Sequence, residues 1–383
     1  MTEKSQHPDP NPSARPISRR VFAVSALSAA MAAALSACGT DSATPAASTP
    51  APGSTTAAGS SSSAAGSSTG GSSSPAATSG SGIALADGVF PVTIEHKLGT
   101  TTIESAPLRV VSVGLTDQDF LLALGVVKVG VTDWYGDQPN AIWPWAKDAL
   151  GSAPAPKMLT NADGIQFGEV AKLKPDLIIG MNTSLTPADY EKLSKIAPTV
   201  TPPATSTSEY FDSWRSYLPG IAAAVGKSGT GAELEKSLTE QFATVAAAHA
   251  DWKGKKAVLL QNAAYDGNFY AYPKGVGTEF LTDLGFDVPT ELDPFIPAEG
   301  GQALVPVERI NVLDSGEYLI WATEGDADKV ALEKIAGFTS LSAVKDGKSV
   351  YTGGILSGAI YFSTPLSLPF VLAELVPLLE AAK

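Results

Sequence analysis

The sequence contains few cysteines, histidines and arginines, and these shortages exclude several classes of protein. It holds a single cysteine, Cys38, so no disulfide can form within the chain. Two histidines follow that cysteine, His96 and His249, and nothing in their positions brings them together. A transition-metal site built from histidines and carboxylates is therefore not expected.

Sequence signatures of enzymes are also missing. The chain has no G-x-S-x-G, H-E-x-x-H, Walker A or G-x-G-x-x-G motif, and Gly275-Val276-Gly277 lacks the third glycine of the last of these. Acidic residues are plentiful, but no spacing among them points to a catalytic pair. We therefore expect a protein that is not an enzyme. The alternative, a cell-surface hydrolase, finds no nucleophile and base in the sequence.

Positive charge is scarce in most of the chain. The formal net charge is −13, and the 37 residues before Cys38 carry +2, so the remainder carries −15. Only Arg109, Arg215 and Arg309 follow Cys38. An acidic chain this poor in arginine is not expected to bind nucleic acid.

What the N-terminus does contain is an export signal. Ser18-Arg19-Arg20-Val21-Phe22 precedes an uncharged apolar stretch that ends in Leu35-Ser36-Ala37-Cys38. The paired arginines resemble the twin-arginine export signal, and the last four residues resemble the bacterial lipobox. We predict a signal peptide at 1–37 and a lipid on Cys38, which anchors the exported protein at the outer face of the cytoplasmic membrane. The alternative is an ordinary signal peptide followed by an unmodified cysteine.

The next segment, 38–85, has the composition of a linker. From 39 to 82 it consists of Gly, Ala, Ser, Thr and Pro, with Asp41 as the one exception. Such a segment buries too little apolar surface to offset the entropy of ordering it. We predict a flexible tether, and its serines and threonines leave O-glycosylation open.

Apolar runs alternate with helical patterns in the remaining chain, which predicts an α/β fold. Expected strands lie at 109–114, 129–131, 176–180, 257–260, 318–321 and 350–351, and expected helices at 119–124, 187–196, 231–252, 278–284 and 366–380. Continuous apolar strands indicate parallel sheets covered on both faces. The length suits two lobes, predicted at 86–229 and 253–383, with the longest helix, 230–252, between them.

A local pattern occurs once in each predicted lobe. Gly168–Leu173 and Val307–Leu313 each read as a short helix with a glutamate near its start, and each leads into a buried strand. The glutamates are Glu169 and Glu308. The helix dipole favours an acid in a first turn and explains each glutamate alone, but it does not explain their matched placement.

Aromatic residues gather where ligand-binding loops are expected. In α/β folds, the loops after the carboxyl ends of strands line the ligand site. One group follows the expected strand 129–131, a second follows the first strand of the second lobe, and Tyr361 with Phe362 lies in a late loop. The first two groups are Trp134, Tyr135, Trp143 and Trp145, and Tyr265, Phe269, Tyr270 and Tyr272. They favour a platform for a bulky, partly apolar ligand, and the alternative is packing of long loops onto the lobes.

Several blocks together resemble a known family. Arg109–Gly114, Leu173–Ile179, Ala197–Val200 and Leu284–Phe286 resemble, in order and spacing, the periplasmic iron-siderophore and vitamin B12 binding proteins of ABC importers. The resemblance covers roughly 87–382.

The resemblance implies two Rossmann-like lobes joined by a single long helix, with a largely preformed ligand cleft between them. It implies that Glu169 and Glu308 dock onto the permease subunits of an importer. Iron would be held by the siderophore, so no cofactor or metal bound by the protein is expected. The protein is expected to act as a monomer.

The ligand class is left between related possibilities. Catecholate siderophores carry more negative charge and favour several arginines, so the scarcity of arginine favours a ferric hydroxamate. Arg215 and Lys274 are the basic candidates for the site. The alternatives are cobalamin or haem on the same fold, with Tyr265 or Tyr272 as the axial ligand of a haem.

Overall fold

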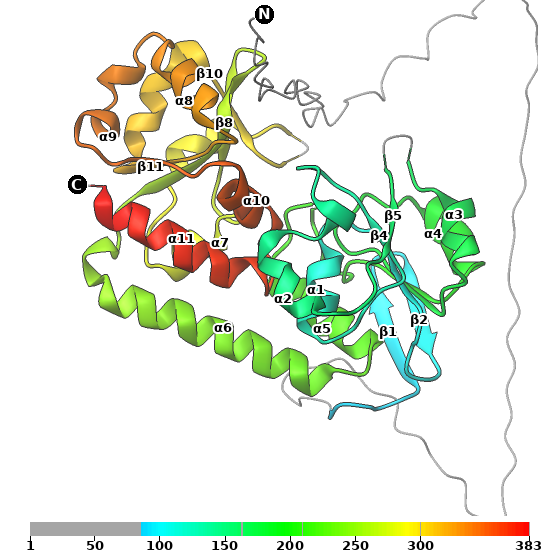
Figure 1. Cartoon of the computed structure of the whole chain (residues 1–383). Helices are drawn as coiled ribbons and strands as arrows, with labels where there is room; N and C mark the ends of the chain where they lie inside the picture. The colour runs from blue at the N-terminus through cyan, green and yellow to red at the C-terminus, as the bar shows by residue number, and fades with distance from the viewer. Residues whose placement is uncertain (1–85, 162–163, 209, 299, 383) are drawn as a thin grey trace, which may run out of the picture. The chain divides into compact units, whose positions relative to one another are not determined.

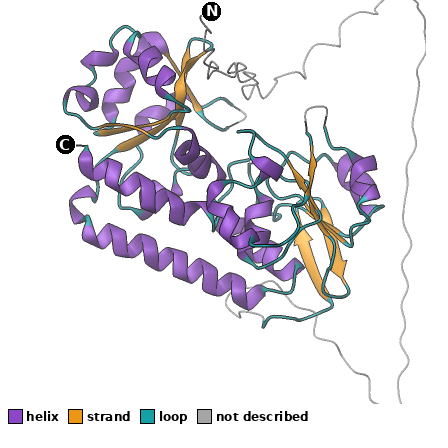
Figure 2. Cartoon of the chain, in the orientation of Figure 1, coloured by secondary structure: helices purple, strands orange, loops and turns teal. Residues whose placement is uncertain are grey.

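A computed structural model describes residues 86–161, 164–208, 210–298 and 300–382. The predicted signal peptide, Cys38 and almost all of the predicted tether lie outside these residues. The described chain forms two α/β lobes, each with a sheet between helices (Figures 1 and 2).

The first lobe is built on a five-stranded parallel sheet. Its strand order is β5-β4-β3-β6-β7, with β3 Val110–Ser112, β4 Gly130–Thr132, β5 Lys157–Leu159, β6 Leu177–Ile179 and β7 Thr199–Val200. Val110 pairs with Leu177 and packs on one face, whereas Val111 pairs with Ile178 and packs on the other. Both faces are covered, as the apolar strands predicted.

The helices of the first lobe cover these two faces. The elements are α1 Asp117–Ala123, η1 Pro139–Ala141, η2 Pro144–Ala146, α2 Lys147–Leu150, α3 Phe167–Lys172, α4 Pro187–Ser194 and α5 Trp214–Ala224. Apolar residues of α1 and α5 pack on the Val110 face, and those of α3 and α4 pack on the Val111 face. A hairpin of β1 Val92–His96 and β2 Gly99–Ile103 precedes the sheet, and no apolar run in the sequence predicted it.

The sheet of the second lobe is mixed: parallel strands form one part of it, and an antiparallel strand lies in the other. Its order is β10-β9-β8-β11-β12, with β8 Ala257–Tyr265, β9 Asn268–Tyr272, β10 Ala303–Pro306, β11 Tyr318–Ala322 and β12 Ser349–Tyr351. β8, β11 and β12 are parallel, but β9 runs antiparallel to both β8 and β10. Asp266 and Gly267 both have positive φ, because they form the tight turn of the β8–β9 hairpin.

The expected aromatic loops of the second lobe are therefore regular elements. Phe269, Tyr270 and Tyr272 lie on β9, and Tyr361 and Phe362 lie at the end of helix α10, Gly354–Phe362. The other elements of this lobe are α7 Glu279–Asp283, η4 Thr290–Phe295, η5 Val307–Ser315, α8 Asp326–Glu333, η6 Phe338–Ser340, α9 Ser342–Lys345 and α11 Ser367–Ala381.

The predicted long helix is α6, Ser228–Ala248, followed by a 3-10 turn, η3 Ala250–Trp252. It begins slightly before the predicted residue and ends at Ala248, with His249 outside the helical region. Figure 1 shows α11 running alongside α6. One continuous core contains Leu238 and Phe242 of α6, residues of α11, and one face of each sheet, so the two lobes share apolar packing.

Candidate ligand-binding site

Six of the predicted ligand residues form one connected aromatic cluster that draws on both lobes. From the first lobe, Trp134 and Tyr135 follow β4, and their rings contact α10 of the second lobe. The centroid of Trp134 lies 5.2 Å from that of Phe362, and the centroid of Tyr135 lies 6.0 Å from that of Tyr361. The six are Trp134, Tyr135, Trp143, Trp145, Tyr272 and Tyr361.

The tryptophans at 143 and 145 form the base of this cluster. Their rings stack at 4.8 Å with an interplanar angle of 15°, and Phe362 packs against both. Trp143 is 3% exposed, so its ring supports the cluster from within. For Trp143 the structure thus favours the alternative to ligand contact, which is packing of a long loop onto the lobes.

Glycines allow this close packing. A methyl group added at Gly358 of α10 would lie 2.5 Å from Trp143 and 3.1 Å from the hydroxyl of Tyr135, and one added at Gly136 would lie 2.6 Å from Trp143. Both distances to the tryptophan are too short for carbon atoms in contact, so a side chain at either position displaces the ring.

The tyrosines bring buried hydroxyl groups together. The ring of Tyr361 stacks on that of Tyr272 at 6.3 Å and donates its hydroxyl hydrogen to the carbonyl of Ala322 at 3.0 Å. The hydroxyl of Tyr135 is buried and has no hydrogen-bond partner among the described residues. An orphaned buried hydroxyl calls for an explanation, and a ligand acceptor supplies one.

These tyrosines are neutral at physiological pH. Burial is the main cause that raises the pKa of Tyr135, Tyr272 and Tyr361, and their own proximity adds to the effect for Tyr135 and Tyr361. Glu324 lies near enough to contribute for Tyr135 and Tyr361, and burial raises its pKa as well. The cluster therefore offers neutral phenol donors and aromatic faces, with a carboxyl group nearby.

Further residues at the cluster were missed from the sequence. Phe211 lies in the loop before α5 and contacts Tyr272 across the lobes at 6.2 Å. Gln261 of β8 accepts hydrogen bonds from Tyr272 at 3.5 Å and from the side-chain amide of Gln302 at 2.8 Å. The aromatic pair Tyr210-Phe211 in an otherwise polar loop was the sequence signal that could have pointed to Phe211. No sequence signal pointed to the glutamines.

The other three predicted ligand residues lie outside the aromatic cluster. Arg215 forms ion pairs with Glu279 at 3.4 Å and Asp283 at 2.9 Å, and its guanidinium lies over the ring of Trp214. Tyr265 ends β8, is 46% exposed, and has Tyr270 as its aromatic neighbour. Lys274 is exposed in the loop after β9. The ring contacts of the cluster include none of these three.

The predicted docking glutamates lie on the surface. Glu169 is in the first turn of α3, where an ion pair with Lys172 at 2.7 Å lowers its pKa. Glu308 is exposed in the first turn of η5, next to Arg309, whose guanidinium lies over the ring of Phe295. Each helix leads into a buried strand, β6 or β11, as the repeat predicted.

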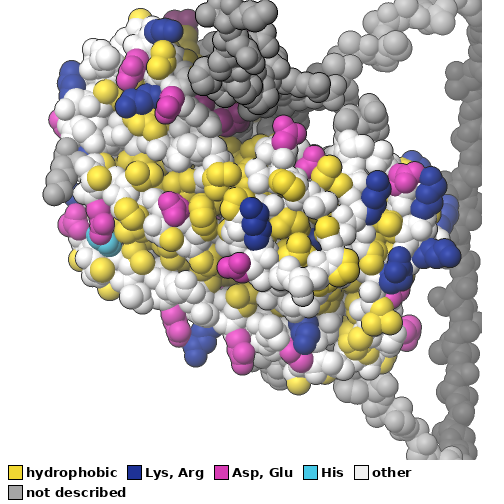
Figure 3. Space-filling model, viewed as in Figure 1, with side chains coloured by type: hydrophobic (Ala, Val, Ile, Leu, Met, Phe, Trp, Pro, Cys, Tyr) yellow, Lys and Arg dark blue, Asp and Glu magenta, His cyan; other side chains and the backbone are white. Residues whose placement is uncertain are grey.

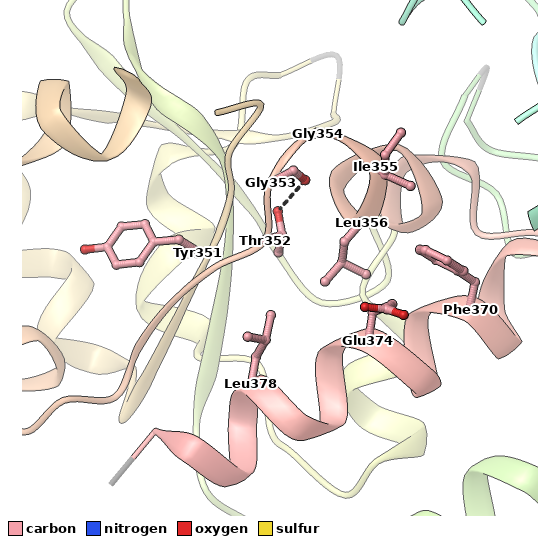
Figure 4. Close-up of a pocket in the computed structure, with 9 residues that line it drawn as sticks. All are labelled: Tyr351, Thr352, Gly353, Gly354, Ile355, Leu356, Phe370, Glu374 and Leu378. Atoms are coloured by element: carbon pink, nitrogen blue, oxygen red, sulfur yellow. Dashed lines mark hydrogen bonds between the residues drawn. The ribbon is translucent and has the colours of Figure 1, made fainter. Parts of the chain in front are cut away.

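Two grooves lie elsewhere in the second lobe. The first has a volume of about 400 Å³ and lies between the start of α10 and α11, with Ile355, Phe370, Glu374 and Leu378 in its wall (Figure 4). Figure 3 shows apolar side chains gathered over the part of this face where α10 and α11 lie in Figure 1. The second groove, of about 680 Å³, lies beside Phe295 and Arg309. Neither contains a predicted ligand residue.

Two kinds of feature are absent from the described part of the chain. It contains no group of three or more His, Cys, Asp or Glu side chains that could hold a metal ion. It also contains no helix long and apolar enough to span a membrane.

Two α/β lobes linked by a long helix, with aromatic residues of both lobes in contact, define a two-lobed binding protein. The family described as periplasmic binding protein matches residues 110–355. The chain belongs to the periplasmic binding protein family. Its members bind solutes rather than catalyse reactions, and membership implies an extracytoplasmic location.

Individual relatives agree with this assignment. A putative ABC transporter substrate-binding lipoprotein, YhfQ of Bacillus subtilis, is 31% identical over 51% of this chain and 58% of its own length. The chain thus spans less than two-thirds of that relative. The structure of a periplasmic solute binding protein from Mycobacterium smegmatis is 41% identical, with a TM-score of 0.70 over 76% of this chain and 98% of its own. Streptococcus pneumoniae PiaA in complex with ferrichrome is 25% identical, with a TM-score of 0.65 over 76% and 99%.

Proposed function

We propose that this protein is the substrate-binding component of an ABC importer and that it carries a ferric siderophore of the hydroxamate class. The observation that carries the proposal is the aromatic and phenolic cluster shared by the two lobes. Neutral phenols donate hydrogen bonds to hydroxamate oxygens, and the tryptophan faces pack against the apolar part of the ligand. The unpartnered hydroxyl of Tyr135 is the first such donor.

The electrostatics of the site favour a hydroxamate over a catecholate. Ferric tris-catecholates are strongly anionic and need cations around them, whereas ferric hydroxamates are neutral or cationic. Two carboxylates already neutralise Arg215, and Glu324 adds negative potential at the tyrosines. Similar proteins are named for both classes, with ferric enterobactin for an Escherichia coli relative and ferrichrome in the PiaA complex.

Tryptophan fluorescence of the full chain tests the ligand class. We expect ferrichrome and ferrioxamine B to quench it with a Kd near or below ~1 μM, and ferric enterobactin to bind at least about tenfold more weakly. Tighter binding of ferric enterobactin would contradict the assignment to hydroxamates. A Soret band on haem addition, or saturable binding of cobalamin alone, would replace the siderophore with those ligands.

The site itself is tested by Trp134→Ala. Loss of an aromatic face should weaken the binding of ferrichrome about tenfold, since such a contact contributes about 0.5–1.5 kcal/mol beyond the area it buries. Trp252→Phe is the matched control, because the ring of Trp252 packs on His249 and Phe286, outside the cluster. Equal affinities for the wild type and Trp134→Ala would remove Trp134 from the site.

The proposal includes delivery at a membrane. We propose that a twin-arginine signal exports the chain, that a lipid on Cys38 anchors it, and that it acts as a monomer on the permease of its importer. Cys38→Ala should move the protein from the membrane fraction to the soluble fraction. An unchanged distribution would leave the lipid anchor without support.

A further inference from the structure

A buried carboxylate, Asp119, joins segments that are far apart in the sequence. Its Oδ2 atom accepts a hydrogen bond from the indole N–H of Trp145 at 2.7 Å and another from the hydroxyl of Thr364 at 2.8 Å. Asp119 lies on α1 of the first lobe, and Thr364 lies in the turn between α10 and α11. Asp119 is 1% exposed, so both bonds form away from water.

Thr364 connects this carboxylate to α11. Its hydroxyl accepts a hydrogen bond from the backbone N–H of Ser367, and the side chain of Ser367 accepts one from the backbone N–H of Thr364. A hydroxyl has one hydrogen, and that of Thr364 is directed to Asp119. The start of α11 is thereby tied to Asp119 of α1, and α11 also contacts η2 of the first lobe.

Trp145 connects the same carboxylate to the aromatic cluster. The ring of Trp145 stacks on Trp143 and contacts Phe362 and Phe370 of the second lobe. Because the indole N–H is held at one point, the plane of the ring is set, and that plane supports Trp143 beneath Tyr135. The hydrogen bonds of Asp119 therefore orient the base of the cluster.

We propose that Asp119 is a positioning residue that locks the first lobe to α11 and sets the aromatic base of the ligand site, so that ligand affinity follows its charge. The affinity part of this inference rests on the proposed function. Both donors point at one oxygen, and an ionised carboxylate accepts two such bonds more strongly than a protonated one.

Two other titratable groups, Lys128 and Asp117, lie near Asp119. Lys128, 2% exposed, acts on Asp119 electrostatically and donates a hydrogen bond to the carbonyl of Gln118 at 3.2 Å. Burial also raises the pKa of Asp117 on α1 to about 6, but its carboxylate accepts from the backbone N–H groups of Met181 and Asn182, whereas Trp145 and Thr364 donate to Asp119. The elements around η2 and the α10–α11 turn contribute the neutral donors Trp145 and Thr364.

Burial shifts the pKa values of both Asp119 and Lys128 toward neutral pH. It raises the pKa of Asp119 to about 6 and lowers the pKa of Lys128 to about 8. Asp119 is thus ionised above about pH 6, and Lys128 is cationic below about pH 8. We expect ligand affinity to be high while Asp119 is ionised and to fall below about pH 6.

Ferrichrome titrations of the full chain between pH 5 and 9 test the effect on affinity. At pH 7.5, Asp119→Asn should raise the Kd about threefold to tenfold, because the charge-assisted bonds become neutral ones. It should also abolish the loss of affinity below pH 6. Trp145→Phe and Thr364→Val should raise the Kd, whereas Thr364→Ser, which keeps the hydroxyl, should match the wild type.

A ligand-free measurement keeps this inference separate from the proposed function. In the full chain with 15N-labelled tryptophan, the indole signal lost in Trp145→Phe should shift with a midpoint near pH 6. In Asp119→Asn that signal should not titrate, and the signal of Trp143 should move. An indole signal of Trp145 that does not titrate in the wild type, or an unchanged Trp143 signal in Asp119→Asn, overturns the proposal even if no siderophore binds.

Discussion

Close approach at single glycines sets the shape of the aromatic cluster. Gly358→Ala should lower the free energy of unfolding by about 1–3 kcal/mol and weaken ferrichrome binding about tenfold, because the added methyl collides with Trp143. Urea unfolding and fluorescence titration measure the two effects. The atoms in collision belong to the outer ring of the indole, so Trp143→Phe in the same chain should restore part of the stability. A fully stable Gly358→Ala would show that the cluster repacks freely.

The charge of Asp119 also affects the stability of the fold. Ionisation strengthens the two hydrogen bonds of Asp119, but it lowers the free energy of unfolding. The native pKa of about 6 lies above the ordinary value of 3.8, so the native state binds this proton more tightly than the unfolded state. This contribution favours folding at low pH and is lost as the pH rises through about 6. Burying the charge costs more than the two hydrogen bonds return.

A comparison of variants isolates that contribution. Asp119→Asn does not titrate, so the wild type should lose about 2 kcal/mol of unfolding free energy relative to this variant between pH 4.5 and 7. Urea unfolding at the two pH values measures the difference, and Asp117 stays in both proteins. A difference that is independent of pH would place the native pKa of Asp119 near its ordinary value.

The sequence pointed to the aromatic residues of the cluster more readily than to their polar partners. Trp134 and Tyr135 stood out because they follow an expected strand, where the loops of α/β folds line ligand sites. Asp119 and Thr364 did not, because 245 residues separate them and neither belongs to a motif. A hydrogen bond between such distant residues is set by the packing of whole helices, which no local pattern contains.

Among the helices, α6 packs very closely against α5 at Gly231. A methyl group added at Gly231 would lie 2.7 Å from the side chain of Ala222 on α5. Gly231→Ala should therefore lower the free energy of unfolding by about 1–3 kcal/mol, although alanine is the better helix former. Gly168→Ala is the control, because its added methyl meets nothing within 4 Å and should be neutral or stabilising. Equal stabilities for both variants would mean that α5 and α6 separate without penalty.

Strands buried on both faces were predicted well, and half-buried strands were missed. Val110-Val111 and Leu177–Ile179 are continuous apolar runs, and they are central strands of the first sheet. The strands of the hairpin β1–β2 alternate buried and exposed residues, so neither contains a continuous apolar run that would have marked it. The Asp266-Gly267 turn was a readable hairpin signal, and it would have predicted the antiparallel part of the second sheet.

At the scale of the whole molecule, the repeated glutamates bear on the proposed docking onto the permease of an importer. Glu308 is exposed and Glu169 is partly exposed, one on each lobe, in the first turn of a short helix. Replacing both by alanine should leave the Kd for ferrichrome unchanged and slow siderophore uptake about tenfold or more, because interface charge pairs are lost. Uptake of labelled ferrichrome by cells that depend on this protein measures the effect.

The control removes equal charge from other parts of the surface. Glu240→Ala with Glu333→Ala takes one exposed acid from α6 and one from α8, and uptake should remain normal. Equally slow uptake in both double variants would point to net charge as the cause. Normal uptake without Glu169 and Glu308 would exclude them as docking residues.

The two helices α6 and α11 have a consequence for the energetics of transport. Since one apolar core runs through both helices and onto both sheets, pulling the lobes apart exposes buried apolar surface, at about 25 cal/mol per Å². If release of a bound ligand requires the lobes to separate, we expect its spontaneous loss to be slow, because thermal motion alone supplies little of that energy. We therefore expect that the work of opening comes from the importer, which makes unloading of the carrier a step driven by ATP.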